Sequence, residues 1–172
     1  MTSTDLDSPG VGPRRSVPLP GWLDYRFGFS VLGLLAFVVQ ELPYLPWLLW
    51  PPADDPLAGN TAATFWLGLL ESVGGVLTVV VLVVLLPRDG VRPRPGGPWF
   101  AGAVACLGVY FACWVAYFAG VTSGWLLVLG LSAPVPVYYL CTGMWLRNRY
   151  TIVTCALFFV GHVGSNALNY LW

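Results

Sequence analysis

Long apolar stretches separated by short polar segments dominate the chain. A transmembrane helix needs about 20 mostly apolar residues, and five stretches reach that length: about 26–46, 63–86, 99–119, 124–146 and 151–171. Pro43 and Pro46 fall in the last turns of the first helix, and an alternative reading ends it near Leu42 and leaves 43–52 at the membrane interface. In the fourth, Pro134 and Pro136 lie near the middle, where we expect a kink. The pattern predicts an all-α membrane protein, a compact bundle of five transmembrane helices within residues 23–172.

Composition supports a membrane protein. The chain is 57% hydrophobic and 9% charged, whereas a soluble domain carries about 25% charged residues. Residues 1–22 contain Pro, Gly, Ser and Asp without apolar periodicity, which predicts a disordered cytoplasmic tail. The net charge is zero, so no general basic surface is available to bind nucleic acid, and none is expected as a partner.

The basic residues predict the orientation in the membrane. All eight are Arg: 14, 15, 26, 88, 92, 94, 147 and 149. With five helices they all fall on one side, and Asp54 and Asp55 fall on the other. The positive-inside rule then places the amino terminus inside and the carboxyl terminus outside, in a multi-pass protein of the plasma membrane. The absence of Lys and the single Ile indicate a bacterial gene from a GC-rich genome.

Ionisable groups inside the membrane are the first candidates for function, because they are costly there and usually face a bundle interior or a wet cavity. Glu41, Glu71 and His162 are such groups, and His162 is the one His of the chain. At 1.5 Å per residue, Glu71 lies roughly 12 Å and His162 roughly 14 Å below the outer ends of their helices. Asn166 lies about 8 Å below, and Gln40 and Glu41 reach about 10 Å if the first helix continues to Pro46.

Helical spacing places these groups on stripes that can face one another. The last helix carries Cys155, Phe159, His162, Asn166 and Asn169 on one stripe. The second carries Thr64, Gly68, Glu71, Gly75 and Thr78, where the small residues would let another helix approach closely. We therefore predict that Glu71 and His162 come within direct or one-water hydrogen-bonding reach. The predicted polar pocket, in the outer half of the membrane, comprises Glu71, His162, Asn166, Gln40, Glu41, Tyr110 and Asn169.

Several functions are compatible with this pocket. One is a structural latch between helices, and another is a site open to the outside that binds a ligand or serves a transport partner. A third is a membrane-embedded enzyme that uses Glu71 and His162 as acid and base on a lipid or isoprenoid. Five helices are few for a self-contained transporter, so a homodimer or a partner membrane subunit is expected, besides the lipid bilayer.

No cofactor or metal is expected. A zinc site could use His162, Glu71 and Glu41, but no H-E-x-x-H spacing supports it, and one His cannot supply bis-His haem ligation without a dimer. The four Cys, at 106, 113, 141 and 155, form no C-x-x-C pair and are expected to pack as small apolar residues.

Two short segments resemble known families. Residues 47–52, Trp-Leu-Leu-Trp-Pro-Pro, resemble in part the W-x-P-P-x-W segment of the tryptophan-rich sensory proteins, which share the size, the five helices and the many Trp.

The spacings from Phe158 to His162 and from His162 to Asn166 are similar to the F-x-x-x-H and H-x-x-x-N motifs of the intramembrane CAAX-type proteases. Both spacings use the same His, whereas that family places them on separate helices, and the E-E-x-x-x-R motif is missing, so the resemblance does not imply the catalysis of that family.

Overall fold

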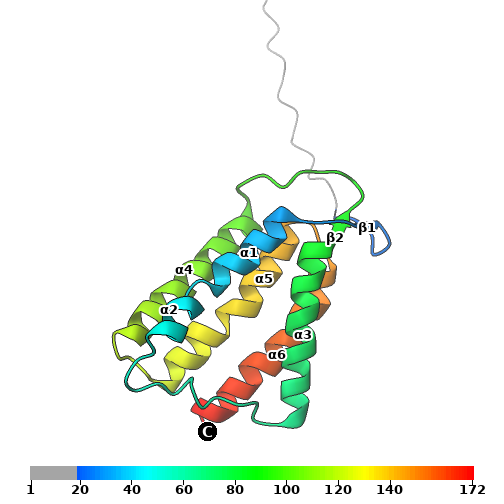
Figure 1. Cartoon of the computed structure of the whole chain (residues 1–172). Coiled ribbons are helices and arrows are strands. Elements are labelled where there is room, and N and C mark those ends of the chain that lie inside the picture. Colours follow the sequence, from blue (N-terminus) through cyan, green and yellow to red (C-terminus); the bar gives the residue numbers. More distant parts are fainter. Residues whose placement is uncertain (1–18) are drawn as a thin grey trace, which may run out of the picture.

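The computed structural model describes residues 19–172 and is a bundle of helices (Figure 1). The elements in chain order are β1 (Tyr25–Phe27), α1 (Val31–Glu41), α2 (Tyr44–Leu49), α3 (Phe65–Val84), β2 (Leu85–Pro87), α4 (Pro98–Phe118), the π-helix η1 (Leu126–Ser132), α5 (Pro134–Trp145) and α6 (Tyr150–Tyr170). Four helices in this part of the chain are long and apolar enough to cross a membrane: α3, α4, η1 with α5, and α6. The predicted all-α membrane bundle is confirmed, while most of the expected tail lies outside the described residues.

The first predicted helix is shorter than 26–46. Helix α1 has 11 residues and ends where Pro43, which has no N–H group, interrupts the hydrogen-bond pattern. The Leu42 N–H group bonds to the Val39 carbonyl at 3.3 Å, and α2 begins at Tyr44. The expectation of one helix to Pro46 is therefore wrong, and the alternative end near Leu42 is correct. Together α1 and α2 still run from one end of the bundle to the other (Figure 1).

A two-stranded antiparallel sheet, which was not predicted, joins the start of the described chain to the end of α3. Tyr25 pairs with Pro87 and Phe27 with Leu85, and the Ser30 N–H group extends the contact to the Val83 carbonyl at 2.7 Å. Because of this sheet, the first helix begins at Val31 and not at 26, and the second ends at Val84 and not at 86. Six Arg residues are described, all in this sheet or in the loops at the same end of the bundle (Figure 1): 26, 88, 92, 94, 147 and 149.

Helices α3 and α6 approach each other at two glycines. A Cβ atom on Gly74 would lie 2.4 Å from the backbone N of Phe158, and one on Gly161 would lie 2.2 Å from the backbone N of Glu71. The small-residue stripe predicted for α3 included Gly75, but a Cβ atom there would meet only the Phe158 ring, at 3.5 Å. The glycine of α3 that faces the backbone of α6 is therefore Gly74, one residue earlier than Gly75 of the predicted stripe.

The span formed by η1 and α5 is the centre of the bundle. Of its most apolar window 67% is buried, against 17% for α3 and for α4, so those two helices present most of their surface outward. A π-helix, which was not predicted, directly precedes the prolines at which a kink was expected. The Ala133 N–H group bonds to the carbonyl of Val128, five residues back, at 2.8 Å, just before Pro134, whose ring does not fit behind a regular helical turn.

Candidate functional site

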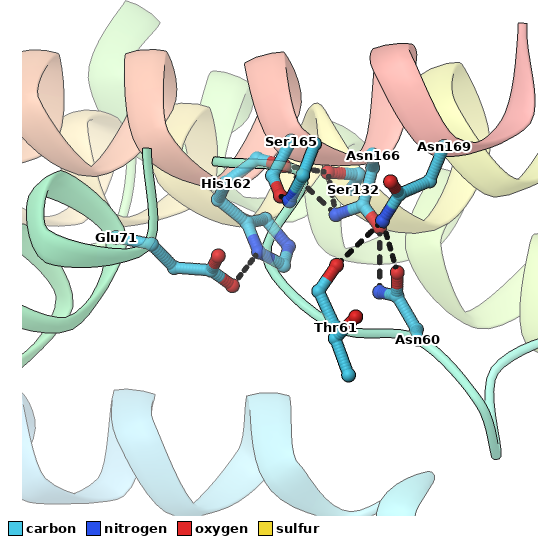
Figure 2. Close-up of polar contacts among 9 residues, drawn as sticks. Asn60, Thr61, Glu71, Ser132, His162, Ser165, Asn166 and Asn169 are labelled. Atoms are coloured by element: carbon cyan, nitrogen blue, oxygen red, sulfur yellow. Dashed lines mark hydrogen bonds and ion pairs between the residues drawn. The ribbon is translucent and has the colours of Figure 1, made fainter. Parts of the chain in front are cut away.

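Glu71 of α3 and His162 of α6 form the predicted pair. The Nδ1 atom of His162 lies 2.8 Å from Oε1 of Glu71 (Figure 2). The side chain of His162 is 17% exposed and that of Glu71 is 33% exposed, so the pair is neither fully buried nor fully exposed. Gly161, next to His162, lets the backbones come close enough for this contact. The Phe158 ring packs against the imidazole with its centre 5.1 Å away.

The second imidazole nitrogen of His162, Nε2, is available to another partner. Within residues 19–172 no side chain or backbone group hydrogen-bonds to Nε2 of His162. A carboxylate on Nδ1 favours the tautomer that carries its proton there, which leaves Nε2 as an acceptor. The pair can therefore hold a proton or bind a polar group of a ligand.

Asn166 and Asn169 belong to a separate amide network that ties α6 to the connection between α2 and α3 (Figure 2). The Nδ2 group of Asn166 donates to the backbone carbonyl of His162 at 2.8 Å and to Oγ of Ser132 at 3.0 Å. Asn60 donates to Oδ1 of Asn166 at 2.8 Å, and Asn169 donates to Oδ1 of Asn60 at 2.7 Å. Sequence reasoning missed Asn60 and Ser132, because Asn60 lies in a loop and Ser132 in the π-helix, where helical spacing gives no signal.

Gln40 and Tyr110 lie together in the core. The amide of Gln40, which is 2% exposed, donates to the Tyr110 hydroxyl at 3.0 Å and accepts a hydrogen bond from Tyr139 at 2.6 Å. Tyr139 was not predicted, since aromatic residues in an apolar helix indicate packing first. These hydrogen bonds lie inside the protein and link α1 to α4 and α5.

A pocket of about 380 Å³ lies between α1 and α3 and ends at His162. Its lining residues are Phe37, Gln40, Glu41, Tyr44, Gly75, Val76, Val79, Val80, Val135, Tyr139, Phe158 and His162. Towards the sheet the two helices close on each other, where a Cβ atom on Gly33 would lie 2.1 Å from the Leu82 carbonyl oxygen. Val76 and Val80 are 65% and 46% exposed and lie within the span of α3, so the pocket opens on the side of the bundle.

His162 also lines a smaller space of about 60 Å³. Tyr44 and His162 line both spaces, and the smaller one also has Asn60 and Asn166 in its wall. Trp114 lines it as well, and its buried Nε1 atom has no hydrogen-bond partner among the described residues. A polar space of this size has room for a few water molecules.

Asp55 holds the loop between α2 and α3 in place at the end of the bundle opposite the sheet. Its carboxylate accepts hydrogen bonds from the Tyr117 hydroxyl and from Nε1 of Trp47, the latter at 3.0 Å. The backbone N–H group of Leu57 donates to the same carboxylate at 3.1 Å. The sequence indicated only a membrane orientation for Asp55, whereas in the structure Asp55 anchors the loop that also carries Asn60.

The chemistry of this region is that of hydrogen bonds and protons. In the part of the chain that the structure describes, no three His, Cys, Asp or Glu residues gather as a metal site would require. Six of the seven predicted residues fall into three groups: the Glu71–His162 pair, Asn166 and Asn169 in the amide network, and Gln40 with Tyr110, which Tyr139 joins. Glu41 lines the larger pocket. Comparison of the chain with protein-family models, curated proteins and solved structures gave no match.

Proposed function

We propose that this multi-pass membrane protein binds an amphipathic organic molecule in the pocket between α1 and α3. The observation that carries the proposal is the 380 Å³ pocket that ends at His162, whose Nε2 atom has no described partner. Pockets of about 300–1,000 Å³ with mostly apolar walls and a few polar groups are the usual form of small-molecule sites. The Glu71–His162 pair would bind or orient the polar end of the molecule.

The shape of the pocket favours a molecule that arrives through the bilayer. Its mouth lies beside Val76 and Val80 in the middle of a membrane-spanning helix. Hydrocarbon can therefore enter from the lipid without crossing a polar end of the bundle. Gln40 and Tyr139 are already paired with each other, so selectivity for the polar end depends on the remaining groups, Glu41, Tyr44 and His162.

Retention of co-purified molecules tests the proposal. Protein purified in a mild detergent or in nanodiscs is denatured, and released compounds are identified by mass spectrometry. Gly75→Leu is the blocking variant, because a side chain there enters the pocket without meeting backbone. Val73→Leu is the matched control, since Val73 is exposed on the same helix and does not line the pocket. We expect Gly75→Leu to lose a compound that wild type and Val73→Leu retain, and equal retention by all three would contradict the proposal.

The second candidate is an enzyme acting on a lipid or isoprenoid with Glu71 and His162 as acid and base. The specific observation in its favour is the Glu71 carboxylate on Nδ1, which would orient the ring with Nε2 as a general base. Incubation of wild type and His162→Gln with membrane lipid extracts distinguishes the two functions. A lipid whose mass changes with wild type alone would favour the enzyme, and unchanged lipids that still bind would favour the binding protein.

The orientation proposed from the Arg residues places the sheet end in the cytoplasm and the carboxyl terminus outside, in the plasma membrane. It is supported by the gathering of the described Arg residues at one end of the bundle. In a Cys-free background, single Cys residues within 53–60 should react with an impermeant reagent added to intact cells. Labelling within 88–96 would overturn this orientation. The expected homodimer or partner subunit is tested by the mass of the purified complex.

A further inference from the structure

We propose that the ligand of the α1–α3 pocket is a lipophilic cation, such as an organic amine with an apolar body, and that Glu41 is its counter-ion. This inference rests on the proposed ligand-binding function and names the charge of the ligand. It follows from the charges around the pocket, the hydrogen bonds of its lining residues and the nature of its walls.

The charges around the pocket do not balance within the protein. Glu71 and Glu41 are both near its polar end, and His162 is the one basic residue that lines it among residues 19–172. His162 is already bound to Glu71 at 2.8 Å. The described Arg residues lie at the sheet end and none lines the pocket. One carboxylate therefore has no cation to pair with.

That carboxylate is Glu41, at the last turn of α1. It is partly buried, and no hydrogen bond or ion pair links it to any other described residue. The amide of Gln40, the neighbouring residue, bonds to Tyr110 and Tyr139 and not to Glu41. An unpaired carboxylate inside a membrane bundle is costly unless it is protonated or bound to a cation.

The walls suit the body of such a cation. Phe37, Phe158, Tyr44 and Tyr139 bring aromatic rings to the pocket, and the valines of α3 complete an apolar wall. Aromatic faces attract organic cations, and apolar walls take up alkyl groups. A ligand with a phosphate or carboxylate would instead meet Glu41, and the one described basic side chain of the lining, His162, is already bound to Glu71.

Binding of a matched pair of probes tests the inference. Wild-type protein in phosphatidylcholine nanodiscs is titrated with radiolabelled decyltrimethylammonium, with empty nanodiscs as the blank, and decanol serves as the uncharged competitor. We expect saturable binding of the cation, with decanol competing at least about tenfold less well, because it lacks the charge that Glu41 attracts. Glu41→Gln should weaken cation binding about tenfold or more, whereas Glu41→Asp should retain most of it.

Control variants separate this inference from the proposed function. Asp54→Asn removes an exposed carboxylate of the loop and should leave binding unchanged, and a melting curve of each variant verifies folding. If decanol binds as well as the cation and Glu41→Gln changes neither, the inference fails while the pocket stands. If neither probe binds saturably, or Gly75→Leu leaves the binding of both unchanged, the inference and the proposed function fail together.

Discussion

Removing the Glu71–His162 contact gives the most direct measure of what holds α3 and α6 together at the pocket. We consider the variants Glu71→Leu and His162→Phe, and the double variant. Leu and Phe keep most of the volume and lack the hydrogen-bonding atoms, and Phe keeps a ring beside Phe158, which stacks on His162. Each single variant should be less stable than wild type, because each leaves a polar partner alone in a partly buried place.

The size of the coupling follows from the geometry. The two atoms are 2.8 Å apart, and the side chains of His162 and Glu71 are 17% and 33% exposed, so the protein does not fully enclose the contact. Side-chain hydrogen bonds between membrane helices average about 0.6 kcal/mol and reach about 1.7 kcal/mol. We therefore expect the double variant to cost about 0.5–1.5 kcal/mol less than the sum of the single variants.

The assay is reversible unfolding in mixed micelles, in which a denaturing detergent is titrated against a mild one. The control cycle combines Glu71→Leu with Asn148→Ala, since Asn148 bonds to the carbonyl of Val81, ten residues and about 15 Å further along α3. That cycle should be additive within about 0.5 kcal/mol. Equal additivity in the Glu71–His162 cycle would refute the reasoning, because a formed contact of this kind cannot leave the two sites independent.

Two further predictions concern the packing of the helices. Gly161→Ala and Gly74→Ala should each lower stability by about 1–3 kcal/mol, because the new methyl group meets the backbone of the facing helix. Gly108→Ala is the control, because a Cβ atom at Gly108 has nothing within 4 Å. Equal melting temperatures of the three variants would show that α3 and α6 do not approach so closely. Asn148→Ala should cost about 1–3 kcal/mol, since it removes two hydrogen bonds of 2.9 Å to the carbonyls of Val81 and Leu85 at the end of α3. Asn169→Ala, at an exposed position, should cost less in the same unfolding assay, and the reverse order would contradict the prediction.

The apolar runs in the sequence were enough to predict the membrane bundle and the four long helices of its described part. They could not show where α1 ends, because Pro43 can either kink a helix or terminate it, and the outcome depends on what covers the freed backbone groups. The sheet of β1 and β2 was hidden for a related reason. Three apolar residues such as Leu85, Leu86 and Pro87 look the same at the end of a helix as in a short strand.

Depth and helical spacing were enough to predict the contact of Glu71 with His162, because α3 and α6 are regular α-helices from these residues to the helix ends. The same reasoning could not find Asn60, Ser132 or the anchor at Asp55. These residues lie in a loop or in a π-helix, where the 3.6-residue period of the α-helix does not relate sequence to direction. Their contacts are decided by tertiary packing rather than by local pattern.

The arrangement of the polar groups separates those that stabilise the bundle from those available to a ligand. Gln40 and Asn166 are buried, and each is fully engaged by neighbours in the protein, so their loss should be felt mainly as lost stability. Glu41 and Nε2 of His162 line the open pocket and have no partner among the described residues. A pure latch would satisfy its polar groups internally and leave none in the lining of a pocket. Strong coupling of Glu71 to His162 together with weaker cation binding in Glu41→Gln would therefore favour a ligand site held in place by the pair, whereas coupling without any binding would leave the pair as a latch.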